Sequence, residues 1–282
     1  MPEMEAVYKL LRGLKVLPPS PQVLPKVLDA LRHEQTTLEE VGELISLDPV
    51  LTATLLHFCN SVYFSGREPV ASVPEAIGRV GFQTIFALVS AVTGSQSFNL
   101  PGASGVDGSQ LWKHSLTTAF ACKFVAEDIE ADGNLLFTAG LLHDIGRVVL
   151  AQAKGAEYGR LCHPALSAGG EVTEREKAAY GFTHADVGAG LMETWKLPDS
   201  LVLAVRFHHR PAAGGVAQKM AAGVCVGNAL AHRFEHPAAE AGGNPELQGA
   251  LELLALGSRH LDVYDEQMQE NWEFVNRLIE LH

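Results

Sequence analysis

Apolar residues recur with the period of an α-helix along most of this 282-residue chain. Leu24, Val27, Leu28 and Leu31 stand at positions i, i+3, i+4 and i+7, so they share one face of a helix. Residues 38–45 repeat much the same pattern. Sustained alternation of apolar and polar residues is absent, and no Asn-Gly or Asp-Gly turn joins two β-branched runs. The sequence therefore predicts an all-α fold.

Capping residues mark helix starts in the first hundred positions. Thr37 with Glu40, and Ser72 with Glu75, have the spacing of a capping box, in which each side chain bonds the backbone N–H of the other residue. An Asp-Pro pair at 48–49 has the form of an N-cap followed by a first-turn proline. The clearest break comes at 99–108, where one proline and three glycines separate two long helical patterns. This run predicts a junction between two packed helical halves.

The composition excludes several classes of partner. The formal net charge is −12, and binding a phosphate backbone requires a basic face that the sequence lacks. The four cysteines are widely spaced in apolar stretches, which is typical of a reducing compartment. The first residues are acidic where a signal peptide would be basic, and no run of about 18 uninterrupted apolar residues follows. We expect a soluble cytoplasmic protein without nucleic-acid or membrane partners.

Six potential metal ligands lie in the second half, on separate amphipathic segments. A buried imidazole without a partner is costly, so several that converge imply either a metal centre or a dense hydrogen-bond network. Five imidazoles and one carboxylate suit borderline divalent metals and exceed the need of one tetrahedral zinc ion. A two-metal cluster bridged by the carboxylate is one interpretation, and a hydrogen-bonded polar core is the other. The six residues are His114, His143, Asp144, His184, His208 and His209.

The periodicity also predicts how these residues are presented. A helix that opens near residue 109 places His114 on its inward face. We place His143 and Asp144 on a single helix, about 100° apart around its axis. His184 is expected at the start of another helix, where the dipole disfavours imidazolium and leaves a lone pair for a metal. Glycines at 188 and 190 would let that helix pack closely. Other histidines are expected to be solvated, among them His33, His232 and His236.

Two sets of short motifs carry a family resemblance. The second half contains Leu111-Trp-Lys-His114, Gly140-Leu-Leu-His143-Asp144-Ile-Gly146, Thr183-His184-Ala-Asp-Val-Gly188 and His208-His209-Arg-Pro211. The first half contains Leu17-Pro-Pro-Ser-Pro21, Ile45-Ser-Leu-Asp48-Pro49, Cys59-Asn-Ser61 and Ala76-Ile-Gly-Arg-Val-Gly81. Together they resemble the HDOD domain, a branch of the HD superfamily related to the HD-GYP phosphohydrolases. The resemblance predicts a domain at 14–212, with an N-terminal helical half at 14–103 and an HD-like bundle at 104–212, followed by a helical extension at 213–282.

The resemblance has consequences for the site. It implies that the six candidate residues bind one or two divalent ions, of iron, manganese, zinc or magnesium. In the related hydrolases a further aspartate completes the site, and metal-bound water attacks a phosphate ester. Asn228 stands where that aspartate would align, and a neutral amide is a weaker ligand that cannot act as a base. The Gly-Tyr-Pro signature of cyclic-di-GMP phosphodiesterases is also missing after His209.

Two functions of different class remain open. HDOD proteins are generally regarded as regulatory modules of bacterial signalling, so the first is a non-catalytic module whose surface binds a protein partner. The second is a metal-dependent phosphohydrolase that acts on a nucleotide or cyclic dinucleotide. Asp144 with metal-bound water would then be catalytic, and Lys113, Arg147 or Arg210 would bind phosphate. The oligomeric state stays open, since the last helix could pack on its own chain or dimerise.

Overall fold

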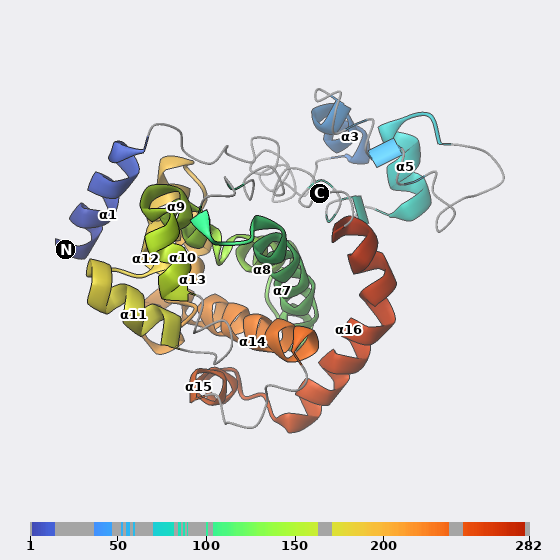
Figure 1. Cartoon of the computed structure of the whole chain (residues 1–282). Helices are drawn as coiled ribbons and strands as arrows, with labels where there is room; N and C mark the ends of the chain where they lie inside the picture. The colour runs from blue at the N-terminus through green and yellow to red at the C-terminus, as the bar shows by residue number, and fades with distance from the viewer. Residues whose placement is uncertain are drawn as a thin grey trace. The chain divides into compact units, whose positions relative to one another are not determined.

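The computed structural model describes residues 2–14, 37–46, 70–81, 104–162, 171–236 and 245–279, together with isolated positions between 52 and 100. All regular secondary structure in these ranges is helical, so the predicted all-α fold is confirmed (Figure 1). The chain forms two compact units. One comprises Met1–Pro18 and Phe98–Ile279, and the other comprises Pro19–Ser97 with Glu280–His282.

The described part of the smaller unit contains α3 (Leu38–Ser46) and α5 (Val73–Val80), which pack on each other. Thr37 and Glu40 form the predicted capping box, with bonds of 3.2 and 2.8 Å. The Ser72 hydroxyl accepts from the Glu75 N–H at 3.3 Å, as predicted, but the Glu75 carboxylate accepts from the backbone N–H at 71. The predicted helix at 24–31, the start at 48–49 and the motif at 17–21 lie outside the described residues.

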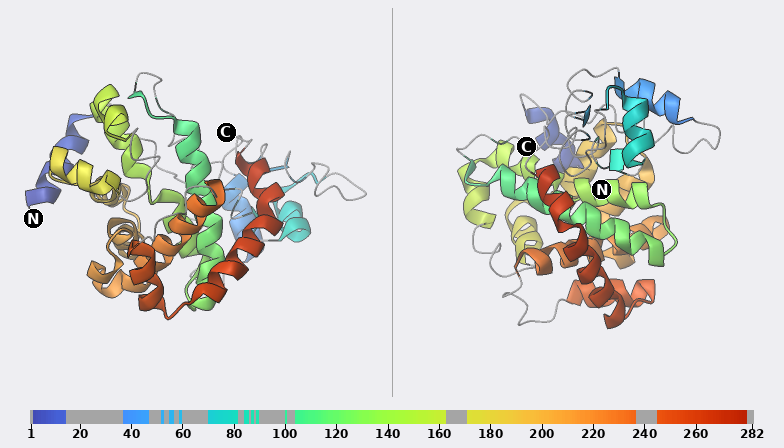
Figure 2. Two further views of the ribbon diagram at one scale, coloured as in Figure 1. Left: turned by 60° about the horizontal axis from the view of Figure 1, so that its bottom comes forward. Right: turned by 90° about the vertical axis from the view of Figure 1, so that its right-hand side faces the viewer.

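The larger unit is a helical bundle built around α7 (Gly108–Asp128), α8 (Gly133–Leu142) and α14 (Gln218–Glu235). Figures 1 and 2 show these three helices near the middle of the unit, with the other helices around them. Those others are α1 (Pro2–Gly13), α9 (Ile145–Lys154), α10 (Ala156–Cys162), α11 (Glu171–Tyr180), α12 (His184–Thr194), α13 (Asp199–Phe207), α15 (Pro245–Leu254) and α16 (Ser258–Ile279), with 3-10 turns at Pro211–Ala213 and Gly215–Ala217.

The helices of the predicted C-terminal extension, α14, α15 and α16, belong to this larger unit. α14 packs on α7. Gly227 of α14 lies so close to Cys122 of α7 that an added Cβ would be only 2.4 Å from the cysteine sulphur. α16 also packs on α7, and the Tyr264 hydroxyl donates to Asp128 at 2.6 Å. Small residues at the crossing let the two backbones approach closely. The HD-like bundle therefore needs the C-terminal helices for its core.

The segment Gly133–Lys154 is long and apolar enough to cross a membrane by length and composition alone. It consists of α8 and α9, which are separated by a turn at 143–144. Within its most apolar window, 89% is buried inside the bundle. The high hydropathy is thus accounted for by burial between other helices.

Candidate metal centre

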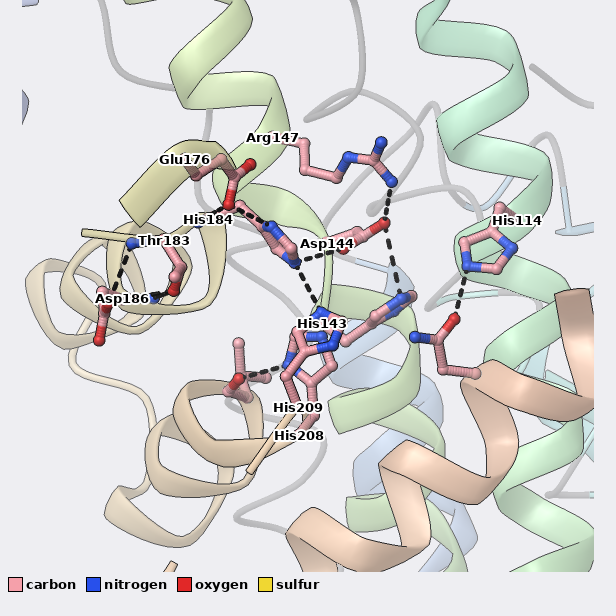
Figure 3. A network of polar contacts seen from close by, with 12 residues as sticks. His114, His143, Asp144, Arg147, Glu176, Thr183, His184, Asp186, His208 and His209 are labelled. Carbon is pink, nitrogen blue, oxygen red and sulfur yellow. Dashed lines mark hydrogen bonds and ion pairs between the residues drawn. The ribbon is translucent and has the colours of Figure 1, made fainter. Parts of the chain in front are cut away.

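The predicted ligands come from four separate places in the larger unit. His114 lies within α7, His184 is the first residue of α12, and the histidine pair at 208–209 follows the end of α13. His143 and Asp144 lie between α8 and α9. Figure 3 shows these side chains gathered in one place, with Asp144 near the middle of the network. The convergence that the sequence predicted is therefore present.

The placement of His143 and Asp144 on a single helix, however, is wrong. α8 ends at Leu142 and α9 begins at Ile145, so the two residues form the turn that joins the helices. Asp144 has φ −100° and ψ 8°, outside the range of a regular helix. The turn allows two neighbouring side chains to face the same site, which the 100° rotation between adjacent helical positions would oppose.

Glycines bring the turn against α12. A Cβ at Gly146 would lie 1.9 Å from the backbone oxygen of His184 and 2.6 Å from the backbone nitrogen of Gly188. Gly190, on the same helix, is in close contact with Val7 of α1, whose Cγ1 would lie 2.8 Å from an added Cβ. Close packing of the glycines at 188 and 190 was predicted. The need for a glycine at 146, where an added Cβ would meet the backbone of α12, was not predicted. This contact places Asp144 next to His184.

The start of α12 is fixed by a capping box. The Thr183 hydroxyl accepts from the Asp186 N–H at 3.3 Å, and the Asp186 carboxylate accepts from the Thr183 N–H at 3.0 Å. These bonds satisfy two backbone donors at the end of the helix. They also determine where His184, the next residue, enters the site.

Replacing Thr183 with alanine is expected to lower the free energy of unfolding by about 1 kcal/mol, because the first turn of α12 loses a hydrogen-bond acceptor. Thr183→Ser keeps the hydroxyl and should remain close to the wild type. Urea denaturation followed by circular dichroism measures both variants. An equal loss in both would contradict a capping role for the hydroxyl.

His143 and His208 are held by the same kind of local contact. In each ring Nδ1 donates to the backbone oxygen three residues earlier, at 2.7 Å to Gly140 and 2.6 Å to Val205. Burial lowers the pKa of His143 to about 4 and the pKa of His208 well below its ordinary value, so both rings are neutral. The lone pair of each ring is therefore on Nε2, and neither Nε2 has a hydrogen-bond partner among the described residues.

His184 lies between two carboxylates. Its Nδ1 is 2.8 Å from Glu176 Oε2, and its Nε2 is 3.1 Å from Asp144 Oδ1. Burial alone would lower the pKa of His184, but the two carboxylates raise it to about 10. The expectation that the helix dipole would disfavour imidazolium here is wrong, because two full charges in contact outweigh the partial charge of a helix end.

The remaining two histidines also contact carboxylates. His114 Nδ1 is 3.0 Å from Glu235 Oε2, and its Nε2 is 2.9 Å from Asn228 Oδ1. His209 Nδ1 is 3.0 Å from Glu246 on α15. One nitrogen of every ring in the cluster is thus fixed by a carboxylate or a backbone oxygen, which is the arrangement that orients histidine ligands around metals.

The sequence reasoning missed three of these partners: Glu176, Glu235 and Glu246. Glu235 could have been found, because it lies seven residues after Asn228 and so on the same face of α14. Glu176 and Glu246 lie on other helices and carry no sequence signal that links them to the histidines. Of the proposed phosphate ligands, only Arg147 joins the network; Lys113 lies over the Trp272 ring at 5.6 Å.

Three further histidines were named as solvated, and His33 lies outside the described residues. His232 and His236 are exposed, as predicted. The His232 ring is nevertheless only 4.3 Å from the His114 ring, measured between centroids. It therefore borders the cluster from the solvent side.

The donor atoms form two groups that suit metal ions. His184, His208 and His209 form one group, while His114, His143 and Asp144 form the other, and within each group the donor atoms lie within 4.8 Å of one another. Asp144 connects them, since its Oδ1 contacts His184. Imidazole and carboxylate are the ligands that zinc, iron and manganese prefer, and two buried Nε2 atoms lack partners among the described residues. The residues present therefore fit a divalent metal.

The cluster is enclosed. Apart from His209, whose side chain is 18% exposed, all its candidate ligands are buried. His209 contacts Glu246, which lines a hollow of about 440 Å³ together with Arg210 and Pro211. Among the candidate ligands, His209 is the most exposed to solvent.

Comparison with known proteins assigns the chain to a family. A model of the HDOD domain matches residues 17–211. The chain belongs to the HDOD family. The match agrees with the range that the motifs suggested, and the recognition of an HDOD domain is confirmed.

The individual proteins that this chain resembles are distant in sequence. An HDOD domain protein of unknown function from Geobacter sulfurreducens has a TM-score of 0.75 at 22% identity, covering 99% of this chain and 97% of its own. A protein described as "Putative phosphohydrolase" from Shewanella amazonensis SB2B has a TM-score of 0.71 at 23% identity, with coverages of 98% and 97%. An uncharacterized protein of Treponema pallidum is 26% identical over 196 residues, 68% of this chain and 37% of that protein. This chain thus spans little more than a third of that curated relative, and the structural likenesses show the fold.

Proposed function

We propose that this HDOD protein is a regulatory module of bacterial signalling in the cytoplasm. Its buried His/Asp cluster would hold a divalent metal that stabilises the bundle, while its surface would bind a protein partner. The observation that carries the proposal is the contact of His114 with Asn228, at 2.9 Å, in an enclosed cluster. An amide at that position offers neither a charged ligand nor a base.

Enclosure supports the same proposal. A phosphate ester must reach the metal-bound nucleophile, and hydrolysis needs an open coordination position. His143, His184 and His208 are each at most 2% exposed. When bound, the metal would supply Lewis-acid chemistry, but the residues that would hold it are buried. A metal in such a place contributes to folding, since its binding free energy is gained only in the native state.

The alternative is a metal-dependent phosphohydrolase that acts on a nucleotide or cyclic dinucleotide. Two groups of donor atoms that share Asp144 favour it, because two-metal hydrolases use a bridging carboxylate in this way. Arg147 would then be the phosphate ligand nearest to the site.

Elemental analysis and a phosphodiesterase assay separate the two functions. We expect bound metal in the purified full chain, loss of the metal in His208→Ala, and retention in the matched control His236→Ala, whose ring is exposed. No hydrolysis of bis(p-nitrophenyl) phosphate or cyclic dinucleotides is expected with added Mn²⁺ or Fe²⁺. Turnover that disappears in His143→Ala would establish the hydrolase instead. Absence of any bound metal would leave the cluster as a hydrogen-bonded core.

A further inference from the structure

The two oxygens of Asp144 have different neighbours. Oδ1 lies 3.1 Å from His184 Nε2, on the side of the group formed by His184, His208 and His209. Oδ2 lies 2.9 Å from Nη1 of Arg147 and 3.7 Å from Nε2 of His143. A guanidinium therefore already contacts the oxygen that a second metal would need (Figure 3).

The second group of donors is obstructed from another side as well. Both nitrogens of His114 are engaged, by Glu235 and by Asn228. A metal at this group would have to displace the Asn228 oxygen from Nε2 and the guanidinium from Asp144. Only His143 offers it a lone pair without a partner among the described residues. In the group of His184, His208 and His209, Nε2 of His208 also has no hydrogen-bond partner among the described residues. The Nε2 atoms of His184 and His209 face each other at 3.1 Å.

The buried charges lead to the same asymmetry. Three carboxylates are nearly enclosed, with side-chain exposures of 4% for Asp144, 0% for Glu176 and 10% for Glu235. Arg147 is the buried cation among them, with 8% exposure. With the imidazoles neutral, as metal ligands must be, two negative charges are left over, which one divalent ion neutralises, whereas two ions would leave an excess of two positive charges. Glu246 is one-third exposed and therefore solvated, and Asp186 is paired with Arg206.

We propose that the protein binds a single divalent ion, held by His184, His208, His209 and Oδ1 of Asp144, and that the Arg147 guanidinium takes the place of a second metal. Three nitrogens and one oxygen are a suitable set for four-coordinate zinc. The inference rests on the metal site of the proposed function. It adds a stoichiometry of one metal ion per chain and assigns to the Arg147 guanidinium the positive charge that a second metal would otherwise supply.

Zinc stoichiometry tests the inference without reference to activity. The full chain is stripped with a chelator, reloaded with excess Zn²⁺ and desalted, and zinc per chain is then measured. We expect one zinc in the wild type, one in Arg147→Lys, which keeps the charge, and one in Asn228→Asp. The double variant Arg147→Met/Asn228→Asp should bind two, because the guanidinium is gone and a carboxylate faces His114.

A second pair of variants locates the ion even if the double variant does not fold. His208→Ala should lose the zinc, while His114→Ala should retain one. Two zinc ions in the wild type, or a single ion lost equally in both variants, would overturn the inference while leaving a metal site. A folded double variant that still binds one would exclude the role of Arg147. No zinc in the wild type would instead overturn the proposed function itself.

Discussion

Replacing Gly146 with alanine is expected to lower the free energy of unfolding by about 3 kcal/mol or more. The added Cβ would lie 1.9 Å from the backbone oxygen of His184 and 2.6 Å from the backbone nitrogen of Gly188. Backbone atoms cannot rotate aside as a flexible side chain can, so α9 and α12 would have to separate. Separation would also draw Asp144 away from His184, and bound metal should decrease in parallel.

Gly249→Ala provides the matched control. Gly249 lies inside α15, and a Cβ there would meet nothing within 4 Å. Alanine is favoured over glycine in helices, so this variant should be neutral or more stable by up to about 1 kcal/mol. Urea denaturation of both variants measures the difference. A Gly146→Ala protein as stable as Gly249→Ala would show that the two helices are not in backbone contact.

Asp144→Asn is expected to destabilise the protein by about 3 to 5 kcal/mol when the unfolding is measured in the presence of a chelator. Arg147 would be left buried without its counter-charge, since its Nη1 contacts Asp144 at 2.9 Å. Burial opposes ionisation of Asp144, but the neighbouring imidazoles and the guanidinium hold its pKa well below the ordinary value. The native state therefore contains an ion pair that the neutral amide cannot replace.

A double-mutant cycle checks the origin of this loss. Asp144→Asn/Arg147→Met removes both charges and should recover much of the stability, because an apolar side chain of similar length can be buried without a partner. Unfolding free energies of the wild type, the two single variants and the double variant complete the cycle. Additive losses would mean that Asp144 and Arg147 have no coupling energy. The loss of stability in Asp144→Asn would then have another cause.

Local physics explains how much of the structure could be predicted. The capping box at Thr37 and Glu40 involves residues three positions apart, so the sequence contains all of it. The orientation of His143 toward the site also depends on a contact within three residues, to Gly140. The turn itself was missed, since an apolar pattern that continues through α8 and α9 has the same appearance whether or not a helix is interrupted.

Periodicity and residue types at short spacing were enough to predict the helical fold and the six side chains that converge, and the short motifs were enough to recognise the family. The charges around those side chains depend on how the helices pack. Glu176 faces His184 across a loop, Glu246 reaches His209 from another helix, and Arg147 occupies one side of Asp144. Electrostatic interactions act through space and fall off over a few ångströms, so the protonation of each imidazole depends on neighbours that chain order does not reveal.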